Sequence, residues 1–142
     1  MINVATSCAC FNIRKTARAI TNLYDTVLQP TDLRATHAIL LMVIAMAGTP
    51  TISRLAEAMM MDRTTVAREL KPLEEQGLVR ITLGGDRRTR LVQLTDAGQA
   101  KRRDVIPLWE QAQARIIAAG LGHKRWSNLY DDLQEVVRLA QV

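Results

Sequence analysis

Three arginines stand close together in residues 84–90, which read Gly-Gly-Asp-Arg-Arg-Thr-Arg. Guanidinium groups bind phosphate oxygens and enter the narrow minor groove of DNA. Alternating apolar residues on both sides of the two glycines predict a β-hairpin with this segment at its tip. Arg87, Arg88 and Arg90 are therefore candidate contacts to a polyanion. We expect Asp86 to pair with Arg88 or Arg90 and orient its guanidinium group.

A second segment with binding chemistry begins at Asp62, a favoured residue at the start of a helix. Thr64 and Thr65 would lie in its first turn, where hydroxyls and free backbone N–H groups bind phosphates. Arg68 would lie one turn further along and can reach the edge of a guanine. This face alone could equally be a solvated helix surface, but the arginine-tipped hairpin that follows favours DNA binding.

The elements that must position these residues follow from apolar spacing and from glycine and proline. Helices are expected over residues 7–28, then after caps at Asp32, Thr51, Asp62 and Thr95, and finally from about His123; the hairpin spans 78–94. The helix after Thr95 should end near residue 119, with an interruption at Pro107, and Pro72 should kink or loosen the helix after Asp62. The sequence thus predicts a mainly α fold with a small β-hairpin wing, a winged helix-turn-helix.

Charge distribution agrees with a polyanionic partner. The 142 residues carry a net charge of +5, and residues 51–103 hold eleven Lys or Arg against seven Asp or Glu, which is +4 of that total. The longest apolar run, residues 38–47, is too short to cross a bilayer, so we expect a cytoplasmic protein without a membrane partner. Apolar stripes on the first and last helices exceed what a small lobe can cover, which predicts a homodimer.

Two cysteines, Cys8 and Cys10, lie near the start, unlike the framework of a secreted disulfide scaffold. Cys10 with His37 or His123 would be the only nucleophile and base, and no triad or glycine-rich phosphate loop accompanies them. The cysteines lack the second clustered pair of a structural zinc site. We therefore expect no enzyme, no metal and no cofactor. The plainest interpretation of both thiols is that of small apolar side chains.

Five segments together resemble the MarR family of regulators. They are residues 55–57, 62–68, 73–80, 86–88 and 94–98. The resemblance implies one MarR-like domain over 1–142, in which 1–30 and 96–142 form a triangular homodimer and 31–95 form the DNA-binding lobe. It also implies a pseudo-palindromic double-stranded operator, and release by small phenolic ligands or oxidants.

The resemblance places the family's phosphate and base contacts on Thr64, Thr65 and Arg68, and its wing-tip arginine on Arg88. Two departures from the family pattern affect the lobe geometry. Met60 stands where the family's turn commonly has Gly, and Pro72 lies inside the recognition helix. The alternative function is a winged-helix protein-interaction module without sequence-specific DNA binding.

A narrower resemblance concerns Cys10-Phe11 followed by Tyr24, which is similar to the organic-hydroperoxide-sensing branch of the family. In that branch a cysteine near the start of the first helix is the peroxide-sensitive thiol, held by two tyrosines. Tyr24 matches one tyrosine, and Arg14 occupies the position of the other, where its charge would favour the thiolate. Cys8 is the candidate resolving thiol. Within a continuous helix, residues two apart point to different sides, so a disulfide would need the first turn to unwind or the bond to cross to a second subunit.

Overall fold

The computed structural model describes residues 3–141 and is mainly helical with one antiparallel hairpin. Its elements in chain order are α1 (Val4–Ser7), α2 (Ala9–Leu28), the 3₁₀ turn η1 (Gln29–Thr31), α3 (Ala35–Ala47), α4 (Ile52–Met59), α5 (Arg63–Glu75), β1 (Val79–Leu83), β2 (Arg90–Leu94), α6 (Asp96–Ile116), the π turn η2 (Ile117–Leu121) and α7 (His123–Ala140). The expected fold class is confirmed.

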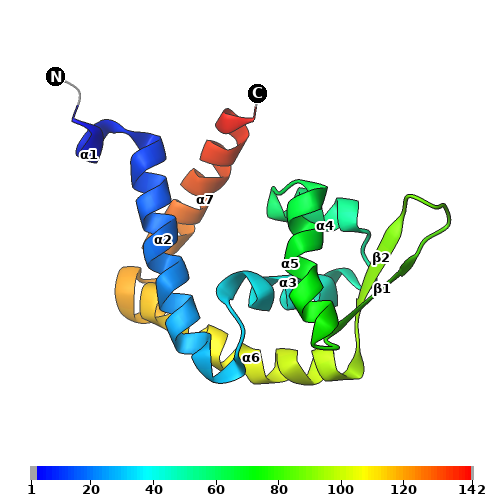
Figure 1. The fold of residues 1–142 in the computed structure, drawn as a ribbon. Coiled ribbons are helices and arrows are strands. Elements are labelled where there is room, and N and C mark those ends of the chain that lie inside the picture. The colour runs from blue at the N-terminus through cyan, green and yellow to red at the C-terminus, as the bar shows by residue number, and fades with distance from the viewer. Residues whose placement is uncertain (1–2, 142) are drawn as a thin grey trace.

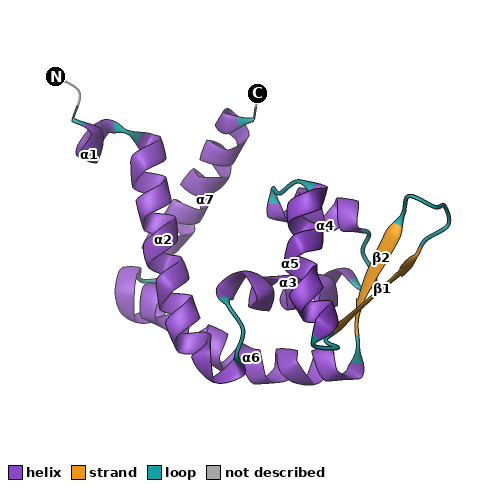
Figure 2. Ribbon diagram, in the orientation of Figure 1, coloured by secondary structure: helices purple, strands orange, loops and turns teal. Residues whose placement is uncertain are grey.

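The molecule has two ends joined by α6 (Figure 1). Helices α3, α4 and α5 and the hairpin gather into a lobe above α6, and the hairpin projects away from it. Helices α2 and α7 stand at the other end, and both labelled ends of the chain lie on their upper side. Figure 2 shows the hairpin as a long two-stranded ribbon with a loop at its tip. Its register pairs Val79 with Leu94 and Leu83 with Arg90.

The core of the lobe forms around α3, which is apolar on nearly every face. Leu40, Leu41 and Ile44 of this helix are fully buried, and the apolar stripe of α5 and Val92 of β2 belong to the same cluster. Full burial of such a side chain stabilises the fold by about 1.5–3 kcal/mol. The stripe, which consists of Val66, Leu70 and Leu73, therefore anchors one face of α5 and leaves its opposite face to solvent.

Three of the four expected helix caps are confirmed. The hydroxyl of Thr51 accepts a hydrogen bond from the Arg54 N–H at 3.1 Å, Asp62 accepts one from Thr65 at 2.7 Å, and Thr95 accepts one from Gly98 at 3.0 Å. Gly98 is also required for close packing, because a Cβ there would collide with the Leu78 carbonyl oxygen.

The expected cap at Asp32 is wrong. Asp32 has a left-handed backbone (φ 60°) and ends η1, so its side chain does not cap α3. The first N–H of α3, that of Ala35, instead donates to Asp25 of α2 at 2.7 Å. This cap comes from tertiary packing between α2 and α3 and leaves no local sequence signal.

Helix boundaries near the two prolines and near the N-terminus also differ from expectation. Helices α5 and α6 run through Pro72 and Pro107 without interruption. Buried residues on both sides of each proline, such as Leu70 and Leu73 around Pro72, offset the one lost hydrogen bond. Helix α6 ends at Ile116, where the short π-helix η2 begins, and not near residue 119. Helix α2 begins at Ala9 rather than at Ser7.

Leu83 is also an exception to the expected alternation of the hairpin. It is 67% exposed because it lies where the hairpin leaves the lobe. Within residues 3–141, no helix combines the length and the apolar character that crossing a bilayer requires.

Candidate nucleic-acid interface

The exposed face of α5 carries the predicted contact residues. Thr64 and Arg68 are exposed and Thr65 is partly buried. The Thr65 N–H and hydroxyl hold the pKa of Asp62 below its ordinary value, because both hydrogen-bond its charged form. Asp62 thus stays ionised at neutral pH and fixes the first turn, where the N–H groups that follow the cap lack helical partners.

The turn between α4 and α5 is tight although its central residue is Met60. Met60 adopts a left-handed backbone (φ 50°), its N–H bonds the Glu57 carbonyl at 3.2 Å, and the Met61 N–H bonds the Ala56 carbonyl at 2.9 Å. A non-glycine residue pays about 1–2 kcal/mol for this conformation. The departure from the family pattern at Met60 therefore leaves a regular helix-turn-helix, because these bonds and the packing of Ala56 enforce the turn.

The hairpin tip is held by Asp86, though not as expected. Its carboxylate accepts hydrogen bonds from the backbone N–H groups of Arg88 at 2.7 Å and Thr89 at 3.0 Å, and from the Thr89 hydroxyl at 3.2 Å. These bonds hold the pKa of Asp86 below its ordinary value. Asp86 was expected to form an ion pair that orients an arginine side chain. Its carboxylate instead bonds the backbone N–H groups of the turn, so it stabilises the backbone of the tip.

The three tip arginines have different surroundings. Arg87 and Arg88 are exposed, whereas Arg90 is half-buried and donates to the carbonyls of Arg87 at 2.7 Å and Thr89 at 3.3 Å. Arg90 thus folds back on the loop.

Sequence analysis missed Arg63, which contacts the wing. From the first turn of α5, its guanidinium group donates to the Arg88 carbonyl at 3.2 Å and so ties the helix to the wing. Its place directly after the Asp62 cap was a signal that it lies in the first turn. Nothing local indicated that the wing would lie within its reach.

Comparison with known proteins agrees with this geometry. A sequence model described as the MarR family matches residues 31–89, which run from the end of η1 through the wing tip. The Mycobacterium tuberculosis transcriptional regulator MosR, solved in complex with DNA, is 32% identical; the match covers 96% of this chain and 100% of that chain, with a TM-score of 0.83. The chain belongs to the MarR family. It shares the winged-helix fold of that regulator.

More distant MarR-type structures share the fold over nearly the whole length. A mutant of Escherichia coli MarR complexed with operator DNA is 22% identical, with 94% of this chain and 96% of that chain covered and a TM-score of 0.83. The PcaV regulator of Streptomyces coelicolor, in complex with its natural ligand, is 20% identical, with 99% of each chain covered and a TM-score of 0.87. No curated protein matches the chain.

The two cysteines of this MarR-family chain lie at a break in the helix. Cys8 has an extended backbone (φ −90°, ψ 111°) between α1 and α2, and its sulfur accepts a hydrogen bond from the Phe11 N–H at 3.4 Å. Cys10 is exposed in the first turn of α2, and Arg14, also exposed, lies one turn further on. The continuous helix expected around both thiols is therefore absent at Cys8.

Tyr24 lies far from Cys10 within one chain. Tyr24 follows Cys10 by fourteen positions, which corresponds to roughly 21 Å along a helix. The Tyr24 hydroxyl donates to Gln113 of α6, and burial raises its pKa, so it is a neutral donor at physiological pH. It lines an apolar pocket of about 470 Å³ between α2, α3 and α6, together with Ile20, Thr21, Ala35, Ile39, Met42, Val43, Met46 and Trp109.

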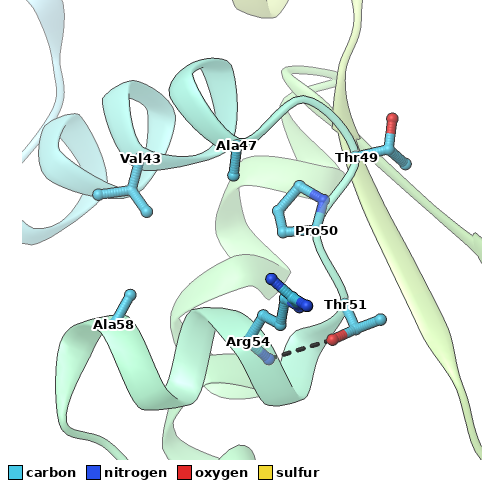
Figure 3. Close-up of a pocket in the computed structure, with 7 residues that line it drawn as sticks. All are labelled: Val43, Ala47, Thr49, Pro50, Thr51, Arg54 and Ala58. Carbon is cyan, nitrogen blue, oxygen red and sulfur yellow. Dashed lines mark hydrogen bonds between the residues drawn. The ribbon is translucent and has the colours of Figure 1, made fainter.

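A separate pocket of about 450 Å³ lies between the end of α3 and α4 (Figure 3). Its walls are mainly apolar, with Val43, Ala47, Pro50 and Ala58, and the Arg54 side chain extends from α4 toward Pro50. One guanidinium group beside apolar walls has the chemistry to hold a small organic anion.

His37, one of the two histidines considered as a base, is engaged elsewhere. His37 of α3 lies 3.1 Å from the Glu69 carboxylate of α5, and this contact joins the core helix to the recognition helix. Across residues 3–141, no group of three or more His, Cys, Asp or Glu is placed to hold a metal ion.

Proposed function

We propose that this MarR-family chain is a repressor that binds a pseudo-palindromic operator as a homodimer. The observation that carries the proposal is the contact between Arg63 and the Arg88 carbonyl, which joins the exposed start of α5 to the arginine-bearing wing. A helix that enters the major groove and a wing that reaches the next minor groove must be held in fixed relation to each other.

Each side chain has a role in this proposal. Thr64 and Thr65 bind backbone phosphates at the helix start, and Arg68 reads a guanine edge in the major groove. Arg88, with Arg87 beside it, enters the minor groove, while Asp86 and Arg90 shape the tip that presents them.

The homodimer is supported by the surface of α7. The structure describes all of this helix, and none of its residues is buried. Its exposed apolar side chains include Leu129, Tyr130, Leu133, Val136 and Val137, and Phe11 and Ile13 of α2 add to them. A second copy would cover this surface, because monomers rarely expose large apolar patches. In this proposal, residues 1–30 and 96–142 form the dimer and 31–95 form the DNA-binding lobe.

The experiment that tests the proposal is DNA binding to the region upstream of the chain's own gene, measured across a salt series. We expect a steep salt dependence and a footprint of two half-sites about one helical turn apart. Light scattering should give a dimer rather than a 15.9 kDa monomer. A protein that binds no duplex would favour the interaction module instead.

We further propose that oxidation of Cys10 releases the operator. An organic hydroperoxide would transfer one oxygen to the Cys10 thiolate, which leaves an alcohol and a sulfenic acid; the Cys8 thiol would then displace the hydroxyl as water and form a disulfide. The exposure of Cys10 and the helix break at Cys8 both support this route. Because α2 belongs to the proposed dimer interface, a disulfide at its start would change the spacing of the two lobes.

The test compares Cys10→Ser with Cys8→Ser under cumene hydroperoxide. Cys10→Ser should keep the operator when wild type loses it, whereas Cys8→Ser should stop at the sulfenic acid. If wild type and Cys10→Ser respond equally, the Cys10 thiol plays no part in sensing.

A small phenolic ligand in the pocket beside Tyr24 is the second candidate signal. The pocket lies where α2 and α6 meet α3, so an occupant would contact both the lobe and the proposed dimer helices. The described residues that line it include no Lys or Arg, which favours a neutral phenol over a carboxylate. Trp109→Ala should abolish a response to such a ligand and leave any response to hydroperoxide intact.

A further inference from the structure

A small cationic cleft lies between the wing and the starts of α4 and α5. It has a volume of about 270 Å³ and is lined by Thr51, Ile52, Ser53, Arg63, Arg88, Thr89 and Arg90. Arginines from two elements thus line one space, and Arg63 and Arg88, which touch there, are twenty-five residues apart in the sequence. We propose that this cleft seats a single phosphodiester group of the DNA backbone, held by the guanidinium groups of Arg63 and Arg90.

The charge in the cleft is not balanced from within the protein. Among residues 3–141, the ion pairs within 4.0 Å are His37–Glu69 and Glu135–Arg138, and neither involves an arginine of the cleft. The Asp86 carboxylate is near Arg90 but does not line the cleft, and it is occupied by the tip N–H groups and by Thr89. A bound anion would be attracted by the positive charges of the arginines that line the cleft.

The arginines are already oriented for this role. Arg63 donates to the Arg88 carbonyl, and Arg90 donates to the carbonyls of Arg87 and Thr89. Each guanidinium group has five N–H donors, so each keeps further donors for an anion. Because backbone carbonyls hold the side chains of Arg63 and Arg90 in place, these two side chains lose less conformational entropy when a phosphate binds.

The position of the cleft decides which anion it takes. In the proposed function, on which this inference rests, α5 enters the major groove and the wing reaches the adjacent minor groove. The phosphodiester strand of the duplex runs between those two grooves. A cleft between the helix and the wing therefore faces that strand, and Ser53 and Thr51 add hydroxyls at the same place.

The first test compares Arg63→Ala, Arg63→Lys and the matched control Arg80→Ala by anisotropy with an operator duplex and with an unrelated duplex. Arg80 is an exposed arginine of β1 that does not line the cleft. Arg63→Ala should raise the Kd for both duplexes about tenfold, since a charged hydrogen-bonded contact is lost without any loss of base readout. Arg63→Lys should recover part of that loss. Arg80→Ala should change the Kd less than about twofold, and thermal unfolding would verify that all variants are folded.

The second test identifies the phosphate itself. This test uses duplexes in which a single phosphate is replaced by a neutral methylphosphonate, one phosphate at a time. Replacement of one particular phosphate in each half-site should weaken the binding of wild type and leave the binding of Arg63→Ala unchanged. If every position weakens both proteins equally, or if Arg63→Ala behaves like Arg80→Ala, the cleft does not seat a phosphate. A wild type that binds neither duplex would overturn the proposed function as well, so the two failures are distinguishable.

Discussion

The lobe and the α2–α7 end of the molecule bury their apolar residues to very different extents. In the lobe, α3, α5 and the hairpin close around Leu40, Leu41, Ile44 and Val92, none of which is exposed at all. At the other end, Leu28 is the one buried residue of α2 and α7 has none, although the structure describes both helices in full. The lobe buries its core within one chain, whereas the apolar surface of α7 is left uncovered by this chain and would be covered by a second copy in the proposed homodimer.

This difference suggests separate roles for the lobe and for the α2–α7 end in the proposed function. A lobe with its own core presents α5 and the wing in a fixed relation, so the proposed contacts with DNA would be encoded within one chain. The distance between two lobes would depend on how two copies of α2 and α7 pack together. In the proposed function, oxidation of Cys10 would change that distance from α2, whereas a ligand beside Tyr24 would act on α2 and on α3 of the lobe together.

The largest expected effect is in the core of the lobe. Leu41→Ala should lower the free energy of unfolding by about 2–5 kcal/mol, because it leaves a cavity in a fully buried cluster. Met46→Ala on the same helix, at a side chain that is 89% exposed, should change it by less than about 0.5 kcal/mol. Denaturant unfolding measures both. Equal effects would show that the lobe is not the self-contained region.

The next effect tests the other end. Leu133→Glu should weaken the proposed dimer by about 2–4 kcal/mol, because a two-fold interface contains each substitution twice and a charge would replace an apolar contact. Sedimentation should detect monomers, while circular dichroism should still report a folded lobe. Lys124→Glu, at an exposed polar position of α7, is the control. Loss of lobe structure in the Leu133 variant would contradict the independence of the two regions.

A smaller effect is expected at the DNA surface of the lobe. Arg68→Ala should cost about 1–3 kcal/mol of operator affinity and relax the preference at one base position. Arg88→Ala should lower the affinity for all DNA sequences, because a minor-groove contact is lost. Binding to a panel of single-base operator variants distinguishes the two. Identical base profiles for both variants would mean that the assignment of helix and wing to their grooves is wrong.

The smallest effect concerns the Asp62 cap and its pH dependence. The pKa of Asp62 is lowered in the folded lobe, so its contribution to stability is present above the ordinary carboxyl value of 3.8 and is lost as the pH falls below it. Asp62→Asn keeps a capping oxygen without the charge. Its deficit in Tm relative to wild type should therefore narrow toward acid pH. Thr51→Ala removes an uncharged cap, so its deficit in Tm should not narrow toward acid pH. If the deficits of both variants depend on pH in the same way, the contribution of Asp62 is not electrostatic.

Sequence analysis predicted the helix order, the hairpin and three caps because these depend on residues close together in the chain. Thr51, Asp62 and Thr95 each bond an N–H three residues away. The same local logic was wrong at Asp32, because the donor of α3 is capped by Asp25 on another helix. It was also wrong at Pro107, through which α6 continues without the expected interruption. Helix α5 likewise extends past Pro72 to Glu75, and the expected kink at Pro72 stays a prediction.

The sequence by itself determined the type of binding surface. Periodicity identified α5, and composition placed hydroxyls and arginines on it and on the wing. Tertiary structure alone decided that Arg63 reaches the Arg88 carbonyl, that three arginines share one cleft, and that Tyr24 lies against Gln113 rather than near Cys10. Local patterns depend on backbone geometry within a few residues, whereas these contacts join elements whose distance is set by how α3, α5 and α6 pack around a common core.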